Sequence, residues 1–227
     1  MSAVRAMPEP WKRRLYLPAY RVHEAARYAG VSPQTVAYWH YRGGALGPVL
    51  PGRQRRKPLS YLELMEVAVV ATFRRLGVSL QKIRKARDYT AQVMNSPFPF
   101  AEYQFKTEGQ HMLMDLGEAD RDSTIAGLVV ADAGGQTAWQ SEIEDRLRQF
   151  DYERDLAIVW HVAGHASPIV IDPRVSFGAP VVRGVPTWAL RGRARAGETI
   201  QELAEDFQLT REHVVAALAF EGVLEAA

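Results

Sequence analysis

A short segment holds side chains that can hydrogen-bond or stack on flat surfaces, and a cluster of cations follows it. The polar and aromatic group comprises Ser32, Gln34, Thr35, Tyr38 and Trp39. On the outward face of a helix, such groups can meet base edges and phosphate oxygens in a major groove. The cations are Arg42, Arg53, Arg55, Arg56 and Lys57. Beside such a helix, clustered cations favour contacts with DNA phosphates over the alternative of a solvated surface loop.

Two short helices joined by a turn are expected to position the first group. Residues 22–41 read VHEAARYAGVSPQTVAYWHY, which predicts a helix over residues 24–28, a turn at 29–31 and a second helix capped by Ser32. The serine hydroxyl can accept from unpaired backbone N–H groups, and Pro33 suits the first helical position. Ala25 and Ala26 allow close approach of the two helices. The apolar side chains expected to face inward are Val22, Val31 and Val36.

The residues that follow predict a wing and then two longer helices. GGALGPVLPGRQRRKPLSY is too rich in glycine, proline and cations to continue a helix. From Ser60, apolar residues recur three or four apart, at Leu62, Met65, Val69, Phe73 and Leu76. Gly77 is expected to end that helix and Ser79 to start the next, whose apolar stripe is Leu80, Ile83 and Ala86. The run Asn95-Ser96-Pro97, with Pro99 after it, then breaks the helical pattern.

The charge of the chain is strongly polarised along its length. Residues 1–60 hold eleven lysines and arginines against two glutamates, a net charge of +9. Because the whole chain carries +2, the remaining residues carry −7. A basic leading end and an acidic remainder suit a phosphate-binding head joined to a body that need not touch nucleic acid.

Length and composition limit the class of protein. With 227 residues, of which 47% are hydrophobic and 24% charged, the chain is expected to form two or three small modules. It has no cysteine, which excludes disulfides and thiolate metal sites and fits a reducing cytoplasm. No apolar run reaches the length of a membrane span and no signal-peptide core is present, so neither membrane insertion nor secretion is expected.

The leading part resembles the DNA-binding domain of the MerR family of transcription regulators. The resemblance rests on YRVHEAARYAGVSPQTVAYWHYRG, the basic wing and SYLELMEVAVVATFRRLGVSLQKI. It implies a winged helix-turn-helix that binds DNA as a homodimer, with the second helix in the major groove. We therefore expect a basic flexible arm over residues 1–19 and the DNA-binding domain over residues 20–92. The family's long dimerising helix is interrupted here by the break after residue 94.

The middle segment, residues 93–165, predicts a small α+β module for docking or dimerisation. Hairpins are expected around Glu108-Gly109 and Gly134-Gly135, a helix over residues 141–150, and a buried strand in DLAIVWHV. Acidic residues that could bind a cation, but more commonly form a hydrated face, are Asp115, Glu118, Asp120 and Asp122. His161 and His165 follow a predicted strand with Gly164 between them, so no metal site is expected. Nucleophile motifs and phosphate-binding loops are missing from the sequence, which predicts neither an enzyme nor a cofactor.

The trailing segment, residues 166–227, predicts a strand pair followed by three helices. The helices are expected over residues 187–195, from a cap at Glu198 or Thr199 to residue 207, and from a cap at Thr210 to residue 220. Their predicted core comprises Ile200, Leu203, Phe207, Val214, Val215 and Leu218. The expected fold class is thus mainly α with a small α+β middle.

This trailing segment closely resembles a small trihelical domain family first catalogued as of unknown function. The matching elements are Ile171-Asp172-Pro173, Gly178-Ala179-Pro180-Val181, Gly184-Val185-Pro186 and the runs 203–207 and 214–218. The combination of both ends resembles VapB-type antitoxins, which implies an antitoxin that binds a PIN-like ribonuclease toxin and represses its own operon. The candidate toxin-binding residues are Arg183, Trp188, Arg191, Arg193 and Arg195.

Two alternatives stay open at this point. Alternating arginines on a short helix are commonly solvated, and the toxin could use the middle module instead. The chain could also be a stand-alone MerR-like regulator that holds a small effector in its middle module.

Overall fold

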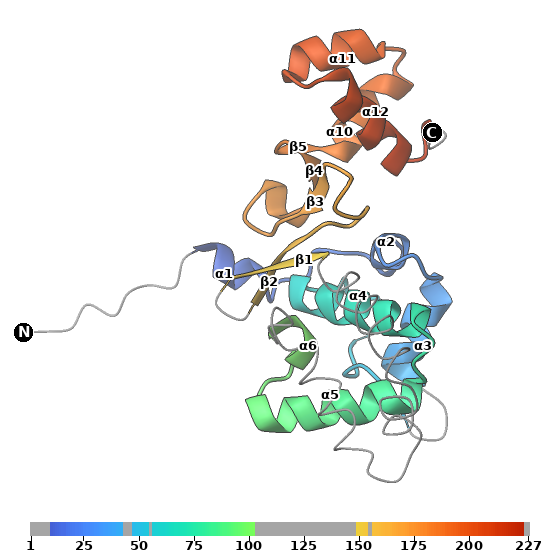
Figure 1. Cartoon of the computed structure of the whole chain (residues 1–227), viewed down its shortest axis with the longest axis vertical. Coiled ribbons are helices and arrows are strands. Elements are labelled where there is room, and N and C mark those ends of the chain that lie inside the picture. Colours follow the sequence, from blue (N-terminus) through green and yellow to red (C-terminus); the bar gives the residue numbers. More distant parts are fainter. Residues whose placement is uncertain (1–9, 43–46, 55, 103–148, 154–155, 225–227) are drawn as a thin grey trace, which may run out of the picture.

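The computed structural model describes residues 10–42, 47–54, 56–102, 149–153 and 156–224. Along its long axis, a helical head, a narrow antiparallel sheet and a second helical bundle follow one another (Figure 1). The predicted fold class, mainly α with a small α+β middle and a helix-turn-helix at the leading end, is confirmed. The predicted hairpins around residues 108–109 and 134–135, the acidic residues 115–122 and most of the predicted helix 141–150 lie outside the described residues.

The head consists of helices in the predicted order. They are α1 (Pro10–Arg14), α2 (Val22–Tyr28), α3 (Pro33–Tyr41), α4 (Tyr61–Arg75), α5 (Leu80–Met94) and α6 (Pro99–Glu102). Ser32, Ser60 and Ser79 cap α3, α4 and α5 by accepting from a backbone N–H three residues on. Helix α4 forms the centre of the head, and nearly all of its side chains are buried. The expectation of a flexible arm is wrong for residues 10–19, because α1 forms there and Leu15 lies in the core of the head.

Helix α5 ends because its sequence stops supporting a helix. Asn95 takes a left-handed conformation with φ of 51°, and the prolines that follow cannot donate the next backbone hydrogen bonds. The short helix α6 then folds back against α4.

A buried ion pair holds this reversal of the chain in place. The carboxylate of Glu66 on α4 accepts from Arg87 Nε at 2.9 Å and from the backbone N–H groups of Phe100 and Ala101 at 2.7 and 3.1 Å. Arg87 also donates to the carbonyl of Pro97 at 2.7 Å. Burial raises the pKa of Glu66 to about 7, and the neighbouring guanidinium opposes that rise.

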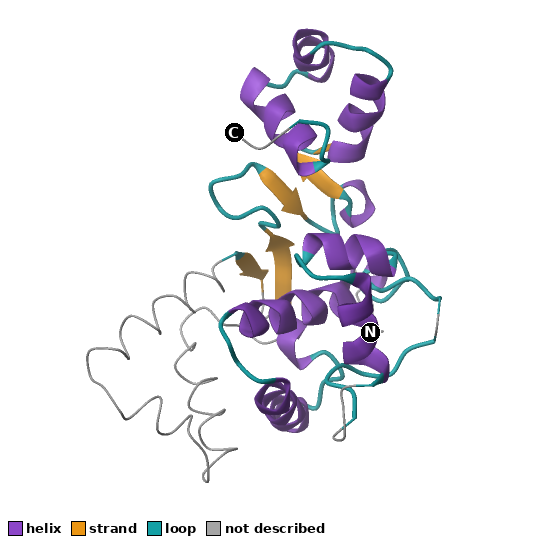
Figure 2. Ribbon diagram, turned by 90° about the vertical axis from the view of Figure 1, so that its right-hand side faces the viewer, coloured by secondary structure: helices purple, strands orange, loops and turns teal. Residues whose placement is uncertain are grey.

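The sheet contains strands β1 (Phe150–Glu153), β2 (Leu156–Trp160), β3 (Ile169–Ile171), β4 (Pro180–Val182) and β5 (Val185–Pro186), paired in sequence order and all antiparallel (Figure 2). It therefore runs across the boundary expected at residue 165. The predicted strand in DLAIVWHV is confirmed as β2. The predicted helix 141–150 is wrong at its end, because Phe150 begins β1. Phe150 and Tyr152 are buried while Asp151 and Glu153 are exposed, and the Phe150 ring stacks on Trp160 with ring centres 5.8 Å apart.

The trailing bundle has helices α10 (Thr187–Arg195), α11 (Ile200–Phe207) and α12 (Arg211–Phe220), with the bounds that the sequence predicts. Thr199, rather than Glu198, caps α11, and Thr210 caps α12. The bundle packs its own core, with Leu203, Val214 and Leu218 at its centre. Ile200 and Phe207 pack against that core as predicted, whereas Val215 is only partly buried and lines a groove on α12.

The Glu66–Arg87 pair yields a pH-dependent prediction. Arg87→Met should lower the free energy of unfolding at pH 8 by about 3–5 kcal/mol, because it leaves a buried carboxylate without its cation. The pKa of Glu66 then rises further above its ordinary value of 4.5, so the folded protein takes up a proton as the pH falls. The loss should therefore grow from pH 5 to pH 8 in urea denaturation.

Glu66→Gln in the Arg87→Met background provides the control, because it removes the carboxylate that the variant leaves unpaired. The double variant should recover part of the loss at pH 8. A loss that is equal at pH 5 and pH 8 would contradict the ion-pair account.

Candidate nucleic-acid interface and interdomain cleft

Helix α3 presents part of the predicted recognition surface to solvent. The Ser32 hydroxyl accepts from the Thr35 backbone N–H at 3.1 Å and contacts the Thr35 hydroxyl at 2.9 Å, which fixes the first turn. Gln34 is exposed, and Tyr38 is 39% exposed on the same helix. Arg42 follows as an exposed residue at the end of α3. The amide, phenol and guanidinium groups are thus available to a ligand that lies along this helix.

Trp39 does not lie on that outward face, and the prediction of its orientation is wrong. Its side chain is 2% exposed within the core of the head. Trp39 follows the fully buried Val36 by three positions, so the two residues share one face of the helix. The Trp39 carbonyl accepts from the backbone N–H groups of Val49 and Leu50 at 3.0 Å each. Trp39 therefore anchors the wing to α3.

The wing holds some of the predicted cations outward and one inward. Arg56 and Lys57 are exposed. The guanidinium side chain of Arg53 is only 4% exposed and lies 3.9 Å from the Glu63 carboxylate, so its expected role at the surface is wrong. The path of the wing turns Arg53 inward. His40 Nδ1 lies 2.8 Å from the backbone carbonyl of Pro51, two residues before Arg53, and fixes this part of the wing. Arg55 lies outside the described residues.

Two arginines that the sequence does not single out position this interface. Arg84 on α5 donates to the carbonyls of Gly47 and Pro48 at the base of the wing. Arg75 on α4 donates to the Ala29 carbonyl in the turn between α2 and α3 at 2.8 Å. Both arginines lie in helices whose apolar period predicts only core packing, and no local pattern signals these long-range contacts.

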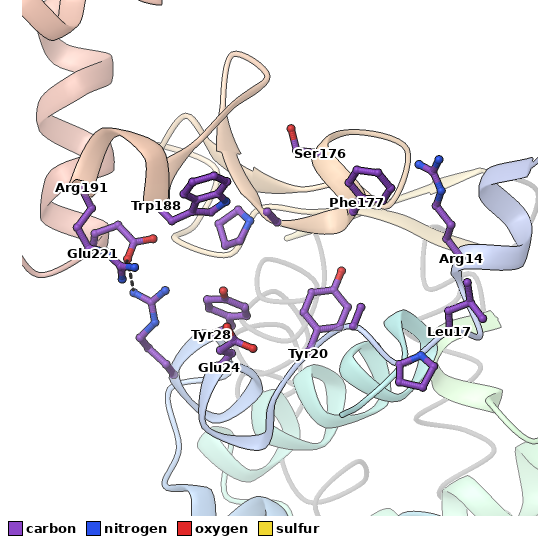
Figure 3. Close-up of a pocket in the computed structure, with 15 residues that line it drawn as sticks. Arg14, Leu17, Tyr20, Glu24, Tyr28, Ser176, Phe177, Trp188, Arg191 and Glu221 are labelled. Atoms are coloured by element: carbon purple, nitrogen blue, oxygen red, sulfur yellow. Dashed lines mark hydrogen bonds and ion pairs between the residues drawn. The ribbon is translucent and has the colours of Figure 1, made fainter. Parts of the chain in front are cut away.

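A cleft of about 580 Å³ separates the head from the trailing bundle (Figure 3). On one side, the buried carboxylate of Glu221 accepts from Arg191 Nη1 at 2.8 Å and from Arg27 Nη1, on α2, at 3.4 Å. Thr187 donates to the second oxygen of the same carboxylate at 2.6 Å. Arg27 also donates to the Phe220 carbonyl at 3.1 Å. One acid thereby joins the first helix of the helix-turn-helix to the trailing bundle.

On the other side of the cleft, Tyr20 joins the head to the loop after β3. Its hydroxyl donates to the Gly178 carbonyl at 2.9 Å, and burial raises its pKa, which keeps the proton on the oxygen. A methyl group on Gly178 would lie 2.1 Å from the Tyr20 oxygen, and the φ of Gly178 is +79°. Only a glycine fits this contact without displacement.

The predicted toxin-binding residues fall into separate environments. Trp188 and Arg191 line the cleft. Arg193 is held by both Glu198 and Asp206 and lies over the Phe207 ring, so it ties α10 to α11. Arg183, in the turn between β4 and β5, and Arg195, at the end of α10, are exposed. The structure thus brings only two of the five residues together at the cleft.

The described residues give no support for metal binding or a membrane span. Among them, no three metal-ligating side chains gather at one place, although the His161 and His165 rings lie 4.0 Å apart. Within the same part of the chain, no helix has the length and apolar character that crossing a membrane requires.

The contact between Tyr20 and Gly178 yields a prediction on stability. Gly178→Ala should lower the free energy of unfolding by about 1–3 kcal/mol, through backbone strain and the clash with the tyrosine oxygen. The loss should be smaller in a Tyr20→Phe background, where the ring carbon, at 3.3 Å, becomes the nearest atom of the side chain. Urea denaturation of the two single variants and the double variant measures the coupling.

Gly184→Ala is the matched control, since Gly184 has φ of +84° and a methyl group added to it would meet no atom within 4 Å. It should show the backbone strain alone and no coupling to Tyr20. Additive effects of Tyr20→Phe and Gly178→Ala would show that the two residues do not form the contact.

Comparison with known proteins supports the division of the chain. Residues 20–90 match the family described as MerR HTH family regulatory protein, and residues 169–220 match DUF433, a family described as a protein of unknown function. A candidate antitoxin of Mycobacterium tuberculosis, VapB45, is 28% identical over 226 residues, with 90% of this chain and 94% of that protein covered. The X-ray crystal structure of Rv2018 from Mycobacterium tuberculosis is also 28% identical, with a TM-score of 0.73 and coverage of 90% of this chain and 99% of that chain. Residues 20–90 are therefore similar to a MerR-type helix-turn-helix domain and residues 169–220 to a DUF433 domain, in a chain that resembles a candidate VapB antitoxin along most of its length.

Proposed function

We propose that this chain is the antitoxin of a type II toxin–antitoxin pair. In this role it binds a PIN-like ribonuclease toxin directly and represses the operon that encodes both proteins. The observation that carries the proposal is the combination, in one chain, of a MerR-type helix-turn-helix and a DUF433 domain that together align with a candidate antitoxin. Both tasks are binding tasks, which take place in the cytoplasm and require no catalytic group or cofactor.

The head is the DNA-binding part in this proposal. Gln34 and Tyr38 face solvent from α3 and are suited to base edges, with Ser32 and Thr35 at the helix start. Exposed cations that can contact the flanking phosphates are Arg42, Arg56 and Lys57, with Arg55 expected beside them. Trp39 and Arg53 support this surface from within.

DNA binding as a homodimer is part of the proposal, because two heads would read two half-sites. Helix α5 ends at Met94 and turns back through α6, so a long dimerising helix does not extend from it. We therefore propose a dimer contact outside the DNA-binding domain, residues 20–92, either in the docking or dimerisation module, residues 93–165, or in the antitoxin-type domain, residues 166–227.

The trailing bundle is the toxin-binding part. A guanidinium placed among the carboxylates of a nuclease forms strong charge-assisted hydrogen bonds and could silence the enzyme. Arg183 and Arg195 are exposed and suited to this role, whereas Arg193 is already engaged by two acids. Trp188 and Arg191 provide a second surface at the cleft.

The wing cations yield a prediction on operator binding. The double variant Arg56→Ala, Lys57→Ala should weaken binding to the operator duplex. In the unaltered chain these cations release the counterions of the phosphates that they contact, and without them those counterions stay bound to the DNA. The plot of log K against log salt should become shallower by about 0.9 for each such phosphate. Operator titrations from roughly 50 to 200 mM salt measure this slope.

Arg195→Ala with Arg211→Ala is the matched control, because it removes the same charge from exposed positions of the trailing bundle. The control should leave the slope unchanged. An equal slope for the wing variant and the unaltered chain would remove the wing from the DNA interface.

The toxin proposal predicts a stoichiometric complex. The tagged full chain, purified from its native cells, should carry a PIN-like ribonuclease in near-equal amount, and the complex should not cleave RNA until the ribonuclease is separated from it. Mass spectrometry and an RNA-cleavage assay measure the two properties. Purification without any nuclease, or with a fully active one, would contradict the antitoxin role.

A stand-alone, ligand-responsive regulator is the second candidate function. The cleft favours it, because about 580 Å³ is within the size range of small-molecule sites, although its lining comes from the head and the trailing part and not from residues 93–165, where the effector is expected. This function predicts that a small effector alters operator affinity in the absence of any partner protein. The ribonuclease purification distinguishes the two candidates.

A further inference from the structure

Exposed hydrophobic side chains gather at the cleft between the head and the trailing bundle. Among the described residues, the large hydrophobic side chains that are exposed are Tyr16, Leu17, Tyr38, Phe177 and Trp188. Leu17, Phe177 and Trp188 line the cleft, and Tyr16 is the neighbour of Leu17. Tyr38 alone belongs to the proposed DNA-binding surface. Such a concentration of apolar side chains at one hollow marks an interaction site.

Phe177 is held outward by the backbone, not by packing. Its ring is 75% exposed, and its φ of 57° is one that bulky residues rarely adopt. Ser176 before it and Gly178 after it also have positive φ, of 45° and 79°. The Tyr20–Gly178 hydrogen bond holds this loop against the head. The fold therefore maintains an unusual conformation that presents an aromatic ring at the mouth of the cleft (Figure 3).

The charged groups of the cleft favour an acidic partner. Arg14 lies over the Phe177 ring, 4.6 Å from its centre, and no acid among the described residues pairs with it. Glu221 is shared by Arg27 and Arg191, so one carboxylate faces two guanidinium groups. Its two oxygens are already occupied by donors, and its side chain is only 2% exposed. Glu24 also lines the cleft, where its carboxylate accepts from the Arg21 backbone N–H at 2.7 Å. The lining therefore holds three guanidinium groups against two carboxylates, and both carboxylates already have donors.

We propose that the cleft receives a segment of the partner protein, which inserts an apolar side chain between Phe177 and Trp188 and directs a carboxylate to Arg14 or Arg191. This inference rests on the proposed function, since the partner is the ribonuclease toxin. Tryptophan and arginine are the residue types that dominate the binding energy of protein interfaces. A protein segment fits better than a small molecule, because Phe177 and Trp188 are still 75% and 55% exposed where they line the cleft, and a larger partner is needed to cover both rings.

The experiment compares variants of the full chain for binding to the purified ribonuclease. Trp188→Ala and Phe177→Asn each remove an exposed ring, and asparagine tolerates the left-handed backbone at position 177. Arg14→Gln removes a rim cation and keeps a polar side chain with N–H donors. Tyr38→Ala is the matched control, because it removes an exposed ring from α3. Calorimetry gives the dissociation constants, operator titration tests the head, and thermal unfolding verifies that each variant is folded.

Trp188→Ala is expected to weaken ribonuclease binding about 30-fold or more, the size of an interface hot spot. Phe177→Asn should weaken it about tenfold, and Arg14→Gln should weaken it severalfold with a reduced dependence on salt. Tyr38→Ala should retain ribonuclease binding and lose operator affinity.

The outcomes separate this inference from the proposed function. If the unaltered chain binds no ribonuclease, both the function and the cleft assignment are wrong. If it binds ribonuclease and the three cleft variants bind equally well, the toxin uses another surface and only the cleft assignment is wrong. If the variants change the mass of the free chain in solution without changing ribonuclease binding, a second copy of the chain covers the cleft. If the cleft variants instead abolish the response of operator binding to a small effector, the cleft is the ligand site of a regulator and the inference is overturned.

Discussion

The shared carboxylate of Glu221 determines how the two ends of the protein are held together. It lies almost completely out of contact with solvent and accepts from Thr187 and Arg191 within the trailing domain and from Arg27 in the head. Separation of the two domains would leave Arg191 and Thr187 on this carboxylate and remove Arg27, which would also lose the Phe220 carbonyl, so Arg27 opposes separation at this point. Tyr20 makes the second connection, at Gly178. The cleft between these two contacts therefore has a defined shape and is lined by both domains (Figure 3).

The recognition surface depends on a different set of contacts within the head. Trp39 packs inward from α3, while its carbonyl holds the start of the wing. Arg75 fixes the turn before α3, and Arg84 fixes the base of the wing. Helix and wing are thus positioned together, which sets the spacing between groups that could contact bases and groups that could contact phosphates. The proposed DNA-binding surface and the cleft involve different elements of the fold.

Helices with strong local signals can be predicted from the sequence. Ser32, Ser60, Ser79, Thr199 and Thr210 all cap helices where a hydroxyl precedes an apolar period of three or four residues. The predicted bounds of the trailing-domain helices agree with the structure, because each helix is short and has a clear start and end.

Orientation and long-range pairing are harder to predict. The aromatic character of Trp39 suggests stacking on the outward face, although its spacing from Val36 already indicates burial. Arg53 carries the same charge as its neighbours, and only the folded wing turns it towards Glu63. The local sequence predicts the end of a helix where the structure has β1. The strand forms because Phe150 pairs with Trp160 on β2, a contact that the local sequence around residue 150 does not show. The connection through Arg27, Glu221 and Arg191 joins residues far apart in the chain, which no local pattern reveals.

The proposed function requires one molecule to bind DNA with its head and a ribonuclease with another surface at the same time. The most direct measurement is the mass of the complex formed when purified ribonuclease is added to the chain already bound to a duplex of its own promoter. We expect a ternary complex that contains DNA, this chain and the ribonuclease together. Release of the DNA by a stoichiometric amount of ribonuclease, or a mass unchanged by its addition, would contradict the account.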